Sequence, residues 1–285
     1  MLRRDSVTLA VFLLKNIDWP IKRIERNKGS LHVVKTIKEI TTALKETDVW
    51  QEWMTEVAAD ERAGVQKAWQ SWQKRQEKKQ LLLQEHQEKI DFDRSYGAKG
   101  ALIAGVDEAG RGPLAGPVVT AAVILPEDCS ALVGLNDSKQ LSKEKRNAFA
   151  ELVKTYALSY SIHFQSAEMI DRLNIYEATK QSMKQSVEAL SIKPDYVLVD
   201  AMTLPIAIPQ DSIVKGDAKS LAIAAASILA KTARDEYMEE LDKEFPMYGF
   251  AKHAGYGTKQ HLEALEVYGP TIHHRKSFEP IKSMI

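Results

Sequence analysis

Thirteen residues from Gly105 to Pro117, GVDEAGRGPLAGP, combine four glycines and two prolines with an adjacent Asp–Glu pair. Glycine-rich loops that follow an apolar strand often bind phosphate through their backbone amides. This stretch has no Gly-Lys-Ser/Thr ending, and its last glycine comes one residue too late for the dinucleotide-binding pattern G-x-G-x-x-G. Both phosphate-loop classes are therefore excluded, and the two acids need another explanation.

The acids of this stretch indicate a metal site. Asp107 closes an apolar strand expected over 101–107, so its carboxylate is held by a rigid element. Adjacent side chains on a strand point to opposite faces, so Asp107 and Glu108 converge only if the chain turns directly after Asp107, as Ala109-Gly110 would permit. Neighbouring carboxylates repel each other unless a cation lies beside them, and hard oxygen ligands suit Mg²⁺ or Mn²⁺. Alternatively, both acids only cap the turn.

Two further acids lie at the ends of expected elements. Asp200 closes the strand YVLVD, and Asp217 precedes an alanine-rich helix. If folding gathers these two with the Asp–Glu pair, the four acids form a site for two divalent ions that supports in-line displacement at a phosphodiester. The amides of Gly110 and Gly112, and the Arg111 side chain, would then contact nucleic-acid phosphates or sugars.

The order of the elements predicts a mixed α/β layer structure. Three closely spaced strands, over 101–107, 118–125 and 156–164, indicate an antiparallel meander. Helices are expected over 142–156, 167–191 and 220–245, and further strands over 194–201 and 213–214. Alanine and serine in the first half of the last helix allow it to pack closely on a sheet.

Composition changes sharply near Tyr96. All five tryptophans precede this residue, whereas only two of the fourteen glycines and one of the ten prolines do. We therefore expect a largely helical N-terminal extension over 1–96 and a second domain over 97–285. The segment DFDRSYGAKG, 91–100, is interpreted as the linker.

Two helices are predicted within the extension. Thr36–Leu44 places its three aliphatic residues on one face, and 68–90 is a long helix rich in Lys, Glu and Gln. Trp69 and Trp72 share a face of the second helix, either as an aromatic surface for nucleic acid or as packing between helices. Packing is favoured because aromatic residues at helical spacing usually belong to a core.

The totals exclude several classes of protein. Formal charge balances at 39 basic against 39 acidic residues, so local charge or metal ions must hold any nucleic acid. One cysteine, Cys129, excludes a disulfide framework and a thiolate zinc site within the chain. The apolar run Val7–Leu14 is too short to span a membrane and no cleavage site follows it, so a cytoplasmic location without membrane association is expected.

Five segments resemble, in order, the successive motifs of bacterial ribonuclease HII. They are GVDEAGRGPLAGPVV, NDSKQLSKEKR, YVLVDA, VKGDAKSLAIAAASILAKTARD and GYGTKQHLEAL…YGPTIHHRKSF, within about Ala101 to Phe278. The resemblance implies an RNase H-like fold with a central mixed sheet flanked by helices. It also implies an endonuclease that hydrolyses the RNA strand of RNA–DNA hybrids and incises 5′ of single ribonucleotides in duplex DNA, leaving 5′-phosphate and 3′-hydroxyl ends.

The resemblance also implies roles for individual residues. Asp107, Glu108 and Asp200 would be ligands of two divalent ions, Mn²⁺ or Mg²⁺, and Asp217 would be the fourth catalytic acid. The substrate-binding residues would be Gly110, Arg111 and Gly112, which sense the 2′-hydroxyl, and Tyr256, which stacks on a sugar at the RNA–DNA junction.

Other polar residues have two interpretations. Ser138 and Lys139 either bind substrate phosphate or belong to a helix-entry loop with Ser142 as N-cap. Lys219 and Lys231 either follow the nucleic-acid backbone or are merely exposed. Four histidines lack the spacing of a zinc site and are interpreted as structural in preference to substrate-proximal: His253, His261, His273 and His274.

Two alternatives compete with this interpretation. Ribonuclease HIII resembles the chain in its acids but lacks the Gly-Arg-Gly triplet and carries a sheet-containing N-terminal domain, so the intact triplet and helical extension favour HII. A nucleic-acid-binding module without catalysis would be favoured by the loss of one acid, yet all four are present.

The expected partners are RNA–DNA hybrids and ribonucleotide-containing duplex DNA, bound by a monomer. The tryptophan-bearing extension is an additional candidate for binding a protein.

Overall fold

The computed structural model describes residues 35–285, apart from 137, 139 and 140. The chain divides into two compact units, Met1–Trp72 (unit 1) and Gln73–Ile285 (unit 2). The apolar run Val7–Leu14 lies outside the described residues. None of the described helices is long and apolar enough to cross a membrane.

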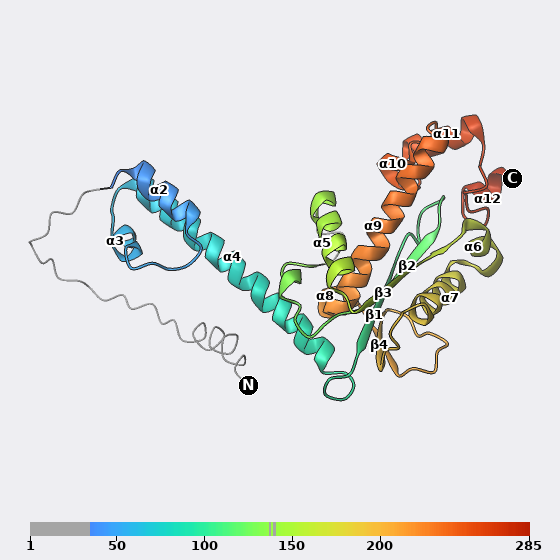
Figure 1. The fold of residues 1–285 in the computed structure, drawn as a ribbon. Coiled ribbons are helices and arrows are strands. Elements are labelled where there is room, and N and C mark those ends of the chain that lie inside the picture. The colour runs from blue at the N-terminus through green and yellow to red at the C-terminus, as the bar shows by residue number, and fades with distance from the viewer. Residues whose placement is uncertain (1–34, 137, 139–140) are drawn as a thin grey trace, which may run out of the picture. The chain divides into compact units, whose positions relative to one another are not determined.

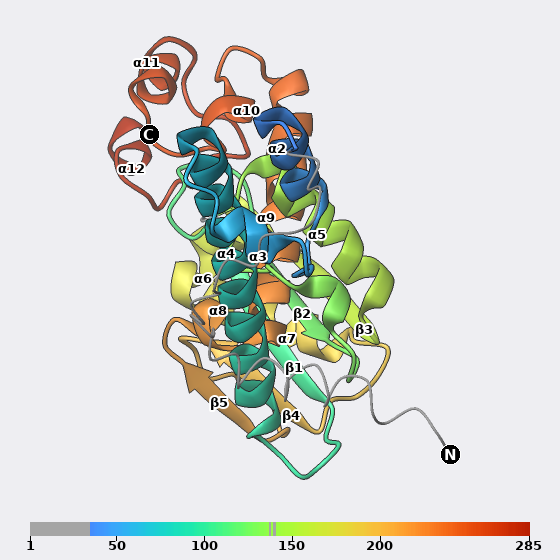
Figure 2. The same cartoon turned by 90° about the vertical axis from the view of Figure 1, so that its left-hand side faces the viewer.

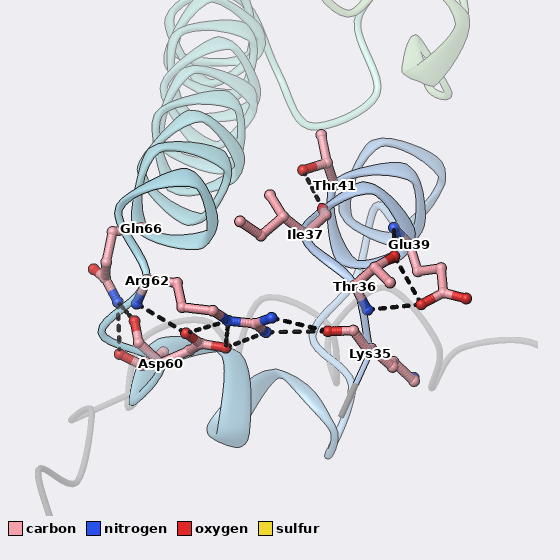
Figure 3. Close-up of polar contacts among 9 residues, drawn as sticks. Lys35, Thr36, Ile37, Glu39, Thr41, Asp60, Arg62 and Gln66 are labelled. Carbon is pink, nitrogen blue, oxygen red and sulfur yellow. Dashed lines mark hydrogen bonds and ion pairs between the residues drawn. The ribbon is translucent and has the colours of Figure 1, made fainter. Parts of the chain in front are cut away.

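Unit 1 contains α2 (Ile37–Glu46), α3 (Met54–Ala58) and the beginning of α4 (Ala63–Arg94). A capping box starts α2, because the Glu39 amide donates to the Thr36 hydroxyl (3.2 Å) and the Thr36 amide donates to the Glu39 carboxylate (2.7 Å; Figure 3). The helix predicted over Thr36–Leu44 is therefore confirmed, and its start is fixed by its own sequence.

Arg62 ties the beginning of α4 to the segment before α2 (Figure 3). Its guanidinium donates to both carboxylate oxygens of Asp60 and, through both terminal nitrogens, to the Lys35 carbonyl at 3.1 Å. The Asp60 carboxylate and the Lys35 carbonyl each accept from two nitrogens of the guanidinium, so both contacts are bidentate and directional.

The core of unit 1 is aromatic. Trp69 and Trp72 are 6% and 3% exposed, and their rings stack with centroids 5.1 Å apart. Trp50 meets both rings edge-on, and Ile40 and Leu44 of α2 complete the cluster. The packing interpretation of the two tryptophans is confirmed.

Unit 2 is built on a five-stranded sheet of order β3-β2-β1-β4-β5 (Figures 1 and 2). Its strands are β1 (Ile103–Ala109), β2 (Val118–Ile124), β3 (Ser159–Gln165), β4 (Tyr196–Asp200) and β5 (Gln210–Ile213). Strands β1, β2 and β3 form the predicted antiparallel meander, whereas β4 is parallel to both β1 and β5. The mixed sheet is therefore confirmed.

Helices cover both faces of the sheet (Figure 1). Along β2, Ala121 and Val123 pack against α9 (Leu221–Glu244) and α5 (Lys143–Tyr156), whereas the alternate residues Ala122 and Ile124 pack against α7 (Ile175–Glu188). Gly105 lets α9 lie on β1, because a Cβ there would come within 2.1 Å of the Ala222 backbone. The alanine-rich half of α9 therefore packs as its composition predicts.

Three local predictions are wrong. The strand expected over 213–214 instead runs over Gln210–Ile213, as β5. The helix expected over 167–191 is broken at Asn174, whose φ of +69° ends α6 and whose side chain accepts from the Glu177 amide to begin α7. The linker expected over 91–100 begins late, because α4 continues to Arg94. Shorter elements complete unit 2: η1 (Ser130–Leu132), α6 (Ala167–Leu173), α8 (Gly216–Lys219), α10 (Phe250–His253), α11 (Lys259–Tyr268) and α12 (Ile281–Met284).

Tertiary contacts explain why α4 extends beyond the predicted helix. Ile90 packs on the cluster beneath α9, and Phe92 and Tyr96 pack on the cluster that contains Leu198 and Ile223. The Asp93 carboxylate accepts from the Ala222 amide at 2.9 Å, at the first turn of α9. The end of α4 thus belongs to the core of unit 2, and the boundary at 96/97 stays a prediction.

Truncations will distinguish the boundary after Trp72, where the first compact unit ends, from the boundary predicted at 96/97. Removing residues 1–72 should leave the cooperative unfolding of unit 2 intact. Removing 1–96 should lower its free energy of unfolding by about 4 kcal/mol, because three partly buried apolar side chains are lost, each worth roughly 1.5–3 kcal/mol when fully buried. Urea denaturation followed by circular dichroism measures both, and equal stability of the two truncations would contradict this assignment.

Candidate active site

The pairing of β1 with β4 brings two acids together. The parallel register opposes Gly105 with Leu198 and Val106 with Val199, so the next position along both strands is occupied by Asp107 and Asp200. Neighbouring strands lie about 4.8 Å apart, and side chains at matched positions project from the same face. The sheet therefore holds both carboxylates side by side where β4 ends.

Glu108 joins these two residues. One carboxylate oxygen from each of Asp107, Glu108 and Asp200 lies within 4.8 Å of the others. The expected turn directly after Asp107 is wrong, because β1 continues to Ala109 and the left-handed conformation first appears at Gly110, with φ of +91°. The Asp107 carboxylate instead folds back to accept from the Glu108 amide at 2.7 Å. The acids thus converge along a continuous strand.

The electrostatics of Asp107 favour a cation. Its side chain is 5% exposed, and burial, followed by the negative charges of Glu108 and Asp200, raises the pKa of its carboxyl well above the ordinary value. The Glu108 amide and the Ser227 hydroxyl of α9 act against this rise by hydrogen bonding. Three hard oxygen donors, one from the buried Asp107 and two from the partly exposed Glu108 and Asp200, fit a divalent ion such as Mg²⁺ or Mn²⁺.

Asp217 lies near this group but is not part of it. The Gly216 amide donates to Asp200 Oδ1 at 2.7 Å. Asp217 therefore directly follows a residue whose backbone contacts the acidic cluster. The Asp217 carbonyl lies 3.4 Å from the buried ammonium of Lys89 on α4, and this ammonium also donates to Asn136 Oδ1 at 3.0 Å. Lys89 was not identified from the sequence, since a lysine within a charged helix carries no distinguishing signal.

A buried arginine holds the Gly-Arg-Gly triplet. The guanidinium of Arg275 donates to the carbonyls of Gly110, Arg111 (2.8 Å) and Gly116 (3.0 Å), and the side chain is fully buried. Burial lowers the pKa of Arg275 to about 9. The sequence offered no signal for this residue.

A second buried arginine supports the same loop from α9. Arg234 donates to the carbonyls of Pro117 (3.0 Å), Ala115 (3.1 Å) and Ala254 (3.0 Å), and burial lowers its pKa to about 10. A Cβ on Gly110 would lie 1.9 Å from Arg234 Nε, which explains a glycine there. The i, i+7 spacing from Ser227, which faces the sheet, is the signal that would have identified this arginine.

Tyr256 lies against the triplet. Its ring atom Cε1 is 3.6 Å from the position of a Cβ on Gly112, and the side chain is 48% exposed. The Leu114 amide donates to the Gly255 carbonyl at 2.9 Å, which joins the two loops. Arg111 lies near one of the acids, with 3.7 Å between its Nη1 and Glu108 Oε1. The structure thus brings Tyr256, the triplet and Glu108 together.

The remaining candidates from the sequence include Ser138, Lys139, Ser142 and Lys231, and those that the structure describes have separate partners. Ser138 is buried, and its hydroxyl hydrogen-bonds with that of Ser227 at 3.1 Å, one step from Asp107. Lys139 lies outside the described residues. Ser142 caps α5 as the alternative interpretation required, and Lys231 forms an ion pair with Asp235.

The histidines that the structure describes lie outside the acidic group. Within the described part of the chain, the three acids are the one group of three or more His, Cys, Asp or Glu residues whose ligand atoms all lie within 4.8 Å of one another.

Comparison with known sequences covers both parts of the chain. The family profile described as Ribonuclease HII matches residues 104–280, and that described as Ribonuclease HII N-terminal domain matches 36–97. Ribonuclease HII of Halalkalibacterium halodurans is 48% identical over 250 residues, which cover 87% of this chain and 95% of that protein. Ribonuclease HII of Enterococcus faecalis is 50% identical over 254 residues, covering 87% and 99%.

Solved structures share the fold. The ribonuclease H2 of Pyrococcus horikoshii superposes with a TM-score of 0.57 at 27% identity, covering 64% of this chain and 96% of that one. The RNase HII of Archaeoglobus fulgidus, solved in complex with PCNA, gives 0.54 at 27% identity, covering 62% and 95%. With the fold, the acidic cluster and these likenesses together, the chain belongs to the ribonuclease HII family of metal-dependent endoribonucleases, which degrade RNA in RNA–DNA hybrids.

Proposed function

We propose that this enzyme, besides degrading hybrid RNA, incises duplex DNA on the 5′ side of a single ribonucleotide, leaving 5′-phosphate and 3′-hydroxyl ends. The observation that carries the proposal is the position of the Gly-Arg-Gly triplet. On one side of the triplet, Arg111 lies 3.7 Å from Glu108, one of the three acids. On the other side, Gly112 lies against the Tyr256 ring. A loop placed there can test one sugar next to the reacting phosphate.

Two divalent ions, Mg²⁺ or Mn²⁺, fit the acidic cluster. Asp107 and Asp200, with Asp217 nearby, would hold one ion, and Asp107 and Glu108 would hold the other. The chemistry that such ions supply is a lowered pKa of the attacking water and stabilisation of the leaving 3′-oxygen.

The chain's own acids contribute orientation. Asp107 and Asp200 project from paired strands, and the Gly216 amide fixes one Asp200 oxygen at 2.7 Å, so little reorganisation is needed when charge develops. No protein nucleophile is required. Cys129 is buried and donates to the Pro126 carbonyl, and burial raises its pKa to about 11, so it remains a neutral thiol.

The triplet is oriented to donate hydrogen bonds to the substrate. In a trans peptide the C=O and N–H bonds point in opposite directions. Because Arg275 binds the carbonyls of Gly110 and Arg111, the amides of Arg111 and Gly112 point away from the buried guanidinium. Backbone amides in that direction suit the phosphate and 2′-hydroxyl oxygens of a ribonucleotide.

Unit 1 is proposed to bind a protein partner. Trp69 and Trp72 are buried in its core and offer no surface for nucleic acid, whereas Val49 and Trp50 are 62% and 43% exposed. Exposed apolar side chains beside a packed aromatic core suit a protein contact more than a charged nucleic-acid backbone.

Replacing single acids tests the catalytic site. Asp107→Asn and Asp200→Asn should each lower the cleavage rate by about 10³-fold, as expected for losing roughly 4 kcal/mol of charge stabilisation. Metal-free Asp107→Asn protein should be at least as heat-stable as wild type near pH 8, because the amide resembles the protonated carboxyl that the raised pKa of Asp107 favours. Asp211→Asn, on the adjacent β5, is the control. Rates within tenfold of wild type in either site variant would contradict the assignment.

A duplex with one ribonucleotide tests the proposed incision. With Mg²⁺ or Mn²⁺, gel analysis should show one cut on the 5′ side of the ribonucleotide and a product that carries a 5′-phosphate. An all-DNA duplex is the control. Cleavage restricted to longer RNA tracts would contradict the proposal and favour the HIII-type specificity.

Two glycine substitutions separate substrate contact from folding. Gly112→Ala should fold normally, because its Cβ would be 3.6 Å from the nearest atom, but should raise KM for the ribonucleotide duplex severalfold by blocking backbone approach. Gly110→Ala should instead lower Tm, because its Cβ would clash with Arg234 at a φ of +91°. An unchanged KM in Gly112→Ala would exclude close contact at the triplet.

A further inference from the structure

Two histidines are fully buried beneath the Tyr256 loop. His261 lies on α11 and His274 lies on the segment that follows this helix, and they are 0% and 1% exposed. Their Nε2 atoms are 3.0 Å apart, so one nitrogen must donate and the other must accept. A hydrogen bond between two imidazoles therefore lies within the core of unit 2.

Neighbouring backbone groups determine which nitrogen carries each proton. The Thr271 amide donates to His274 Nδ1 at 2.9 Å, so His274 carries its proton on Nε2 and donates to His261. His261 Nε2 then accepts, which places the His261 proton on Nδ1, 2.9 Å from the Tyr256 carbonyl that accepts it. The chain of hydrogen bonds has one direction, from Thr271 through both rings to Tyr256, and every member is satisfied.

An added proton on either ring breaks this chain. A protonated His274 Nδ1 would face the Thr271 N–H, and a protonated His261 Nε2 would face the N–H of His274. The nearby groups also disfavour positive charge on the pair: His253 of α10, which stacks on His261 with centroids 4.8 Å apart, disfavours it on His261, and His273 disfavours it on His274. Burial lowers the pKa of His261 and lowers that of His274 to about 4.

The pair joins the two loops assigned to substrate. On one side, His261 binds the Tyr256 carbonyl, and His253 Nδ1 accepts from the Gly255 amide at 3.2 Å. On the other side, His274 forms a β-bridge with Ala115, and Arg275 binds the triplet. The side chains that enclose the pair are Tyr248 and Phe250, both buried aromatics.

We propose that His261 and His274 form a neutral, proton-ordered pair that fixes the Tyr256 backbone against the Gly-Arg-Gly triplet. Both histidines are thus positioning residues for binding the strand that contains the ribonucleotide. This inference rests on the proposed substrate contact of Tyr256, through which the pair acts.

The protonation pattern is directly measurable in the intact protein. ¹⁵N NMR of histidine-labelled enzyme at pH 7.5 should show His261 as the Nδ1–H tautomer and His274 as the Nε2–H tautomer. His163, which hydrogen-bonds with Ser182 on the other side of the sheet, provides an internal reference. A cationic ring, or the opposite tautomer at either position of the pair, would overturn the proposal without reference to activity.

A double-mutant cycle tests positioning. His261→Leu should raise KM for a duplex with one ribonucleotide about fivefold, the lower end of one stacking contact, with little change in kcat. His261→Asn, whose amide reaches the Nδ1 position, should recover most of this loss. In a Tyr256→Ala background His261→Leu should add nothing, because the residue through which it acts is already absent. His163→Asn is the matched histidine control and should leave KM unchanged.

The outcomes separate this inference from the proposed function. If Tyr256→Ala leaves KM unchanged, the substrate role of Tyr256 fails, whatever the NMR tautomers are. If Tyr256→Ala raises KM but His261→Leu raises it further by the same factor in that background, the positioning role is overturned. Should His261→Leu fail to fold, His261→Asn alone and in the Tyr256→Ala background supplies the same cycle.

Discussion

The parallel pairing of β1 with β4 is the constraint on which the site depends. It sets Asp107 opposite Asp200, on the face that α9 covers. A shift of one residue in this register would turn Asp200 to the opposite face, because side chains alternate along a strand. Gly105 makes the arrangement compatible with a close helix, since no side chain separates β1 from α9. The packed sheet, together with the hydrogen bonds from the Glu108 and Gly216 amides, therefore holds the acids together against their mutual repulsion.

The substrate loops are organised by a different device. Two buried guanidinium groups, those of Arg275 and Arg234, bind backbone carbonyls of the loop from Gly110 to Pro117, and the imidazole of His261 binds the Tyr256 carbonyl. These buried side chains satisfy their hydrogen bonds on the backbone that they position. The carbonyls of Gly110 and Arg111 are turned toward the interior, and under the proposed function the amides of Arg111 and Gly112 donate to the nucleic acid.

Local sequence predicted the parts of this structure that local physics controls. The helices over Thr36–Leu44 and from Ser142, the antiparallel meander and the position of Asp200 at the end of β4 follow from periodicity, capping and chemistry, whereas Asp107 lies within β1 and not at its end. The break at Asn174 was missed although it has a local signal, an asparagine that adopts a positive φ and caps the next helix, whereas the end of α4 was missed because Phe92 packs on residues distant in sequence. Lys89 binds the Asp217 carbonyl and Arg275 binds the Arg111 carbonyl, both far away in sequence, so no spacing pattern identifies either residue.

The most direct test of the acidic cluster is anomalous diffraction from crystals of the enzyme soaked in Mn²⁺. We expect anomalous density among the carboxylates of Asp107, Glu108 and Asp200, and its loss in Asp200→Asn crystals. Saturating Mn²⁺ that leaves no density at these three carboxylates, or that binds only elsewhere, would show that folding does not gather them to hold catalytic metal.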